Sequence, residues 1–167
     1  MLLPRIIPCL LIKDGGLVKT INFKEPKYIG DPINAVRIFN EKKVDELVVL
    51  DIDATVYNQE PDLTLISKIA SECRMPLCYG GGIKSIEQIK KIISLGVEKI
   101  SISSQSILDP NIISEASMLV GNQSIVVTLD IKIENGELSL FTHNGKIKVD
   151  KDPIDLIRNL QNHGVGE

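Results

Sequence analysis

A glycine triplet between an apolar segment and a helical pattern is the feature of this sequence with the clearest chemistry. Residues 75–79 form an apolar run, Gly80, Gly81 and Gly82 interrupt it, and isoleucines at helical spacing begin at Ile86. Because glycine has no side chain, the backbone N–H groups of such a loop can approach a phosphate closely. A helix that starts behind the loop adds unpaired N–H groups and the positive end of its dipole. The pattern predicts a phosphate-binding loop, although a purely structural turn can have the same sequence.

The composition argues against several other classes of protein. The 167 residues have a net charge of −3 and 4% aromatic residues, which does not suit a general nucleic-acid-binding protein. Cys9, Cys73 and Cys78 lack Cys-x-x-Cys spacing, so we expect reduced thiols in the cytoplasm and neither disulfides nor a metal site. Arg5 and Pro8 interrupt the first apolar segment, which argues against a signal peptide or a membrane span.

Strand and helix patterns alternate along the chain. Apolar runs typical of strands lie at 5–12, 46–50, 76–79, 97–103 and 124–130. Helical patterns lie near 32–39, 63–69, 86–95, 110–116 and 153–160, with Asp31-Pro32, Asp109-Pro110 and Asp152-Pro153 as helix starts. Repeated strand–helix units predict a parallel sheet that is buried on both faces. A doubly wound sheet and a (β/α)8 barrel both fit this pattern.

Two segments do not follow the alternation. Residues 14–30 are expected to form a long loop with glycines and lysines, including Lys19. After the fifth strand, Asn135-Gly136 and Asn144-Gly145 are typical of type I′ turns. They predict a small antiparallel excursion at about 131–148.

Several motifs together resemble the cyclase subunit of imidazole glycerol phosphate synthase, a family of histidine biosynthesis. They lie at 5–10, 13–15, 30–32, 45–47, 50–54, 80–83 and 121–130. The run at 8–13 is most similar to a branch of the family that accompanies surface-polysaccharide genes. The resemblance implies a (β/α)8 TIM barrel, here incomplete, with about five parallel strands, five helices and the antiparallel excursion. Residues 1–167 would then be one partial domain, the N-terminal part of a truncated family barrel.

The resemblance also implies a reaction and its site. The family converts a phosphoribulosyl-formimino ribonucleotide into imidazole glycerol phosphate and an aminoimidazole carboxamide ribonucleotide, with ammonia from a partner glutaminase and without a cofactor or metal. Asp130 matches a catalytic aspartate that serves as general acid or base. The implied phosphate and substrate contacts are Lys19, Gly81, Gly82, Ser103 and Ser104. Asn144 falls where the family has a small polar residue.

One position departs from the family. Its second catalytic aspartate corresponds here to Leu11, which cannot carry a proton. Asp14, Asp51 and Asp53 remain open as substitutes, with solvated or capping roles as the alternative reading. Leu11 therefore keeps two other functions open. One is an ammonia-handling, cyclase-like protein for sugar amidation in surface-polysaccharide synthesis, and the other is an inactive truncated fragment.

Four charged residues match the family's ammonia gate at the opposite end of the barrel: Arg5, Glu46, Lys99 and Glu167. Arg5, Glu46 and Lys99 each lie at or near the start of a strand, so we expect them to meet on one rim and to form a docking face for the glutaminase. This match argues against a related barrel, the isomerase of the preceding step, which shares the glycine loop but takes no ammonia. Strands one and five are expected to be open edges, so the isolated chain should be marginally stable, self-associate or swap strands.

Overall fold

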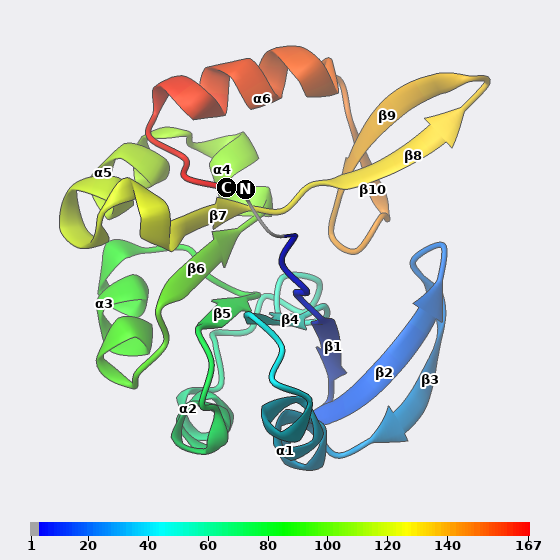
Figure 1. Ribbon diagram of the computed structural model, residues 1–167. Coiled ribbons are helices and arrows are strands. Elements are labelled where there is room, and N and C mark those ends of the chain that lie inside the picture. The colour runs from blue at the N-terminus through cyan, green and yellow to red at the C-terminus, as the bar shows by residue number, and fades with distance from the viewer. Residues whose placement is uncertain (1–3) are drawn as a thin grey trace.

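The computed structural model describes residues 4–167 and has a curved sheet with helices on its outer face (Figure 1). The strand order is β3-β2-β1-β4-β5-β6-β7. The five expected parallel strands are β1 (Cys9–Lys13), β4 (Leu47–Asp51), β5 (Leu77–Gly80), β6 (Lys99–Ile102) and β7 (Ile125–Val127). The fold is an incomplete (β/α) barrel, as the resemblance implies.

The helices begin where the sequence places their caps. The five expected ones are α1 (Pro32–Lys42), α2 (Leu63–Glu72), α3 (Ile86–Ser94), α5 (Asn111–Val120) and α6 (Pro153–Asn162). Asp31 and Asp152 accept N–H bonds of the first turns, and Ser85 forms a capping box with Gln88. A short helix, α4 (Ser104–Leu108), and a 3-10 turn, η1 (Asn122–Ser124), were not expected.

The core lies between the sheet and the helices. Alternate strand residues point to this layer, and Ile12, Val49 and Ile100 are at most 1% exposed. The isoleucines of α3 contribute from the other side, with Ile89 and Ile92 fully buried. This packing fixes the carboxyl ends of the strands, and so positions the loops that follow them.

The segment 14–30 is a hairpin and not the loop that was expected. It forms β2 (Gly16–Ile21) and β3 (Lys24–Gly30), joined to β1 through a turn at Asp14-Gly15. Both turn residues have positive φ, at 49° and 74°, and Lys13 pairs with Gly16. Because β2 pairs along β1, the expectation of an open edge at strand one is wrong.

The antiparallel excursion is confirmed, with β8 (Asp130–Glu134), β9 (Glu137–Thr142) and β10 (Ile147–Val149) in a separate sheet. Asn135-Gly136 is a two-residue turn, since Glu134 pairs with Glu137. The second turn is longer than expected because Thr142 pairs with Ile147. Positive φ values at His143, Asn144 and Gly145 build this turn.

Asp130 lies slightly beyond the element in which it was expected. The parallel strand β7 ends at Val127, and Asp130 opens β8, where it pairs with Phe141. The bond from Thr128 N–H to Ile102 O extends the pairing with β6 by one residue, and the chain then leaves β6 and pairs with β9 from Asp130 onward. Asp130 nonetheless remains at the carboxyl edge of the sheet.

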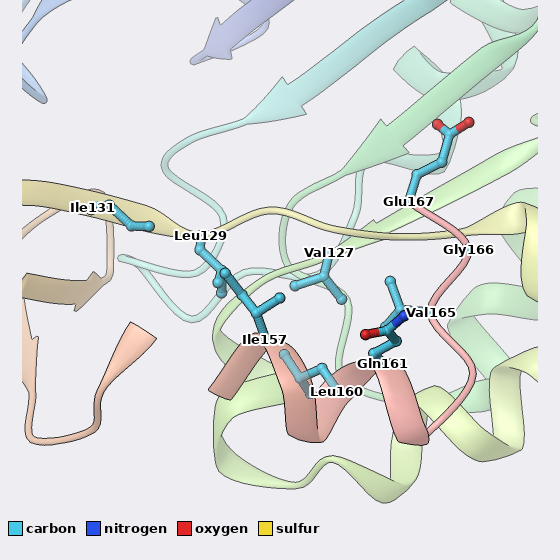
Figure 2. A pocket seen from close by; sticks show the side chains of 9 residues that line it. All are labelled: Val127, Leu129, Ile131, Ile157, Leu160, Gln161, Val165, Gly166 and Glu167. Carbon is cyan, nitrogen blue, oxygen red and sulfur yellow. The ribbon is translucent and has the colours of Figure 1, made fainter. Parts of the chain in front are cut away.

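The last residues lie against the outer edge of β7. Val127 N–H donates to Glu167 O at 2.9 Å, and Gly166 N–H donates to Ile125 O at 3.0 Å. The edge of strand five is therefore partly occupied. Beside it, β7 and α6 leave an apolar cavity of about 540 Å³ (Figure 2). In the part of the chain that the structure describes, no helix is long and apolar enough to span a membrane.

Candidate active site

A cavity of about 270 Å³ lies at the carboxyl ends of β5 and β6. Gly81, Gly82, Ser103 and Ser104 all line it, so the structure brings together four of the predicted phosphate contacts. Gly81 and Gly82 have φ values of 120° and 70°, which disfavour residues with a side chain. A Cβ atom at Gly81 would lie 2.4 Å from the carbonyl oxygen of Asp51. The loop therefore needs glycine for conformation and for space.

A lysine that the sequence argument did not select also lines this cavity. Lys84 follows the glycine loop, and its amine donates a hydrogen bond to Asn58 Oδ1. An amine beside backbone N–H groups makes the cavity suitable for a phosphate. Its position two residues after Gly82 was the signal that could have found it.

A second, smaller cavity of about 80 Å³ adjoins the first and contains two carboxylates. Asp51 and Asp130 line it, and Gly81, Ser103 and His143 line both cavities. Asn144, the small polar position of the resemblance, lies in its wall with Leu50, Ser101 and Thr128. The shared walls mean that one molecule could place its phosphate in the larger cavity and reach both carboxylates.

Asp130 is held by the long turn between β9 and β10. Its Oδ2 accepts a hydrogen bond from Gly145 N–H at 2.9 Å. Burial raises the pKa of Asp130 above its usual range, and the Gly145 bond and the charges of Lys132 and His143 oppose that shift. A carboxyl with a raised pKa is better suited to give and take a proton.

Asp51 is the last residue of β4. Its Oδ1 accepts the N–H groups of Asp53 and Ala54, at 3.1 and 3.0 Å. Burial raises its pKa, these two bonds lower it, and the neighbouring Asp53 and Asp14 raise it further. The net shift is upward, in the same direction as that of Asp130.

Three other residues considered from the sequence lie outside both cavities. Lys19 is exposed on β2, where it pairs with Lys27, so the structure does not place it with the glycine loop. Asp53 is buried and bonds the amine of Lys13. Leu11 is half-buried in β1, opposite Leu50 of β4.

Arg5, Glu46, Lys99 and Glu167 meet at the opposite end of the strands and are called the charged ring below. Lys99 Nζ lies 2.9 Å from Glu46 Oε2 and 2.8 Å from Glu167 Oε2. Arg5 reaches Glu167 Oε1 at 2.9 Å and Glu46 Oε2 at 3.4 Å. Each cation therefore contacts both carboxylates, although the four residues come from distant parts of the chain.

The charged ring is partly withdrawn from water. The Glu46 side chain is 4% exposed and that of Lys99 is 15% exposed, whereas Arg5 and Glu167 lie nearer the solvent. Burial lowers the pKa of Lys99, but its bonds to Glu167 and Glu46 outweigh this effect and the pKa is raised. Bonds from Lys99 and Arg5 lower the pKa of Glu167. Lys99 and Glu167 are therefore held in their charged forms at neutral pH.

Comparison with known proteins places the chain in a family whose region of similarity includes both cavities and the charged ring. A family model described as "Histidine biosynthesis protein" matches residues 5–167. This chain belongs to that family. The match spans both cavities and the charged ring, so every predicted site residue lies within the family's region of similarity.

Three relatives illustrate the similarity within the histidine biosynthesis family. A protein of Vibrio vulnificus, provisionally named imidazole glycerol phosphate synthase subunit hisF3, is 54% identical over the whole chain and 65% of its own length. One of Pseudomonas aeruginosa, provisionally named subunit hisF2 of the same synthase, is 53% identical over 98% of this chain and 65% of its own. Imidazole glycerol phosphate synthase subunit HisF of Campylobacter concisus is 40% identical over 98% of this chain and 65% of its own length. The chain thus spans about 65% of the length of these relatives.

The family match leaves some of the site to be found from the structure alone. Thr55 and His143 line both cavities, and neither was selected from the sequence. They arrive from loops far apart in the chain, so no local spacing could have linked them. Within residues 4–167, no group of three or more His, Cys, Asp or Glu side chains is arranged to hold a metal ion.

Proposed function

We propose that this chain forms part of a cyclase that uses ammonia to convert a phosphoribulosyl-formimino ribonucleotide into imidazole glycerol phosphate and an aminoimidazole carboxamide ribonucleotide. The observation that carries the proposal is the pair of adjoining cavities, one lined by the glycine loop and the other by Asp130. The two cavities suit a substrate that binds through a phosphate at one end and exchanges protons at atoms further along the molecule. The names of the relatives support the same reaction.

In this proposal each cavity has its own task. Backbone N–H groups at Gly81 and Gly82, the hydroxyls of Ser103 and Ser104 and the Lys84 amine bind the phosphate. The substrate is then positioned with its reacting atoms beside Asp130. The ammonia nitrogen bonds to the ketone carbon, whose oxygen leaves as water, and to the formimino carbon, whose bond to the aminoimidazole ribonucleotide breaks. The Asp130 carboxylate takes a proton as ammonia adds, and a carboxyl returns one to the departing amine.

The charged ring fits the entry of ammonia from a glutaminase partner. Lys99 of the ring and Ser101 alternate along β6 and so lie on one face of it, and Ser103 follows its end in the wall of both cavities. Ser101 also bonds Thr128 of the neighbouring segment. A line of small polar groups can pass a polar molecule between the two ends of the sheet. We propose the rim around the ring as the glutaminase docking face.

The test is turnover of the ribonucleotide by the full chain, with ammonium chloride as the ammonia source. We expect formation of imidazole glycerol phosphate, and a rate about 100- to 10,000-fold lower for Asp130→Asn, the usual range for loss of a general acid or base. Asp155→Asn is a suitable control because the Asp155 side chain is 76% exposed and lines neither cavity.

A wild-type chain that binds the ribonucleotide but forms no product would contradict the proposal. If the same chain binds a glutaminase and stimulates it, the alternative of ammonia supply for sugar amidation is favoured. Leu11 is the observation that keeps this second function in view, since it removes one of the two expected catalytic carboxylates.

A further inference from the structure

The position of Leu11 leaves the proposed reaction with one assigned carboxylate where two are needed. Leu11 lies in β1 and pairs with Leu50 of β4, close to the carboxyl edge of the sheet. Three aspartates lie near this point, at the ends of the same two strands: Asp14, Asp51 and Asp53. Their surroundings differ, and these differences show which of the three can exchange a proton with a substrate.

Asp14 and Asp53 are unsuited to proton transfer on a substrate in either cavity. The Asp14 side chain is 81% exposed, in the turn that follows β1. Asp53 is 6% exposed, and its carboxylate is bound by the Lys13 amine, which also lies 5.7 Å from the centre of the Tyr57 ring. Neither aspartate lines the cavities beside the glycine loop.

Asp51 lies in the wall of the cavity that contains Asp130. It ends β4, and its backbone pairs with Ile12, the residue after Leu11. Two N–H groups bind Oδ1, as described above, and fix the orientation of the carboxyl. Oδ2 has no hydrogen-bond partner among residues 4–167. The carboxyl is therefore held in place through one oxygen while the other is free to exchange a proton.

The phosphate loop packs directly on this residue. A Cβ atom placed on Gly81 would lie 2.7 Å from Cβ of Asp51. A substrate whose phosphate is bound by the glycine loop would consequently have its next atoms beside Asp51. Asp130 lies in the wall of the same small cavity, at the start of β8, which follows β7, three strands from β4 in the sheet.

We propose that Asp51 is the second proton-transfer residue of this site and works with Asp130 in place of the carboxylate that Leu11 lacks. The inference rests on the proposed cyclase function. As ammonia adds to the substrate, one carboxylate takes the proton that the new C–N bond releases. The ammonia nitrogen forms two C–N bonds, one to the ketone carbon, whose oxygen leaves as water, and one to the formimino carbon, whose bond to the aminoimidazole ribonucleotide breaks. The other carboxyl gives its proton to the amine that departs, and the change is redox-neutral.

The electrostatics of the cavity agree with this division of work. The titratable groups around Asp51 are Asp130 and His143 in the cavity, Tyr79 on β5, and Asp53 and Asp14 on the neighbouring loops. Burial and the two nearby aspartates raise the pKa of its carboxyl. A raised pKa lets a carboxyl hold a proton at a higher pH than an exposed aspartate can.

The test compares three substitutions in the full chain, with ammonium chloride and the phosphoribulosyl-formimino ribonucleotide. Asp51→Asn keeps an oxygen that can accept both backbone N–H groups but loses the exchangeable proton. We expect it to lower the rate constant by about 100-fold or more, as Asp130→Asn does. Asp14→Asn, the exposed candidate, should remain within twofold of wild type. Thermal melts and binding of imidazole glycerol phosphate check that each variant retains its fold and site.

The outcomes separate this inference from the proposed function. A rate for Asp51→Asn within threefold of wild type, with Asp130→Asn inactive, overturns the role of Asp51 and leaves the cyclase function in place. A wild-type chain without turnover overturns both. If Asp51→Asn does not fold, the ¹³C carboxyl resonance of Asp51 in the wild-type chain decides. It must shift when imidazole glycerol phosphate binds, while that of Asp14 does not, and an unshifted Asp51 signal overturns the inference.

Discussion

At the scale of single residues, backbone conformation decides where the site can be. Gly81 and Gly82 adopt positive φ values in places where a Cβ atom would collide with backbone oxygens. One collision is with Asp51 O at the end of β4, and the other is with Gln59 O in the loop between β4 and α2. The glycines thus bring the phosphate loop onto the strand end that bears Asp51, and this contact joins the two cavities.

Gly81→Ala should therefore destabilise the protein more than an alanine substitution at a glycine that has positive φ but open space around it. Positive φ alone costs about 1 kcal/mol or somewhat more, and the collision with Asp51 O adds to it. We expect a loss of about 2–4 kcal/mol in the free energy of unfolding, measured by urea denaturation. Gly136→Ala is the matched control, since its φ is 86° but no atom lies within 4 Å of the added Cβ. Equal losses for the two variants would contradict the packing argument.

The residues that could be predicted from the sequence are those whose signal is local. The glycine loop and its helix were recognisable because strand, turn and helix follow each other within a dozen residues. Asp130 and the four members of the charged ring were found only through the resemblance. His143 and Thr55 could not be found, because tertiary folding alone brings their loops to the cavities. The role of Lys19 remains a prediction, and its strand lies apart from the glycine loop.

Among the elements, the unexpected hairpin β2–β3 brings its tip against the turn between β9 and β10 (Figure 1). Phe23 at its tip packs on Gly145, whose N–H binds Asp130. The Lys132 amine lies 5.6 Å from the centre of the Phe23 ring and 4.1 Å from that of Phe141. The hairpin thereby supports the turn that holds the proposed catalytic aspartate.

The hairpin had a signal in the sequence that the loop interpretation overlooked. Asp14-Gly15 is one of the strongest two-residue hairpin turns, and Leu17 and Val18 after it are buried apolar residues. The interpretation failed because lysines and glycines in 14–30 were read as typical of a loop. The short helix α4 gave no such signal, since Ser103 makes no capping bond and the helix has only five residues.

The contact of the C-terminal residues with β7 should depend on pH through Glu167. Its pKa is lower in the folded protein than its ordinary value of 4.5, owing to Lys99 and Arg5. The stabilisation is therefore complete above 4.5 and is lost as the pH falls through the lowered pKa of the folded state. Amide NMR signals of Val127 and Gly166, recorded from pH 6 to pH 3, should report release only below 4.5.

Glu167→Gln supplies the control for this titration. The variant lacks the carboxylate, so its Val127 and Gly166 signals should show no transition tied to this group. A transition of the same size and midpoint in the variant would show that Glu167 does not control the contact. Added salt should weaken the effect, because the Glu167 side chain is 38% exposed.

At the scale of the whole molecule, an incomplete barrel leaves apolar surface beside β7. Val127, Leu129, Ile157, Leu160 and Val165 line the groove shown in Figure 2. Ile157 of α6 is 44% exposed there. Exposed apolar surface at a partly paired strand edge favours association between chains.

We therefore expect the isolated chain to associate with itself as its concentration rises. Sedimentation velocity should show a concentration-dependent increase in average mass, and Ile157→Lys should reduce it by placing a charge in the groove. Met118→Lys is the control, since Met118 is 80% exposed and lies outside the groove. A monomer whose mass and melting temperature do not change with concentration would contradict this expectation.

The most direct measurement is titration of the full chain with imidazole glycerol phosphate, followed by amide NMR. The account predicts saturable shifts at Gly81, Gly82 and Ser103, with a smaller response at Gly145, whose N–H binds Asp130. Amides beside the charged ring at the other end of the strands, such as that of Glu46, should not respond. Shifts confined to the charged ring, or no saturable shift at the glycine loop, would contradict the assignment of the active site.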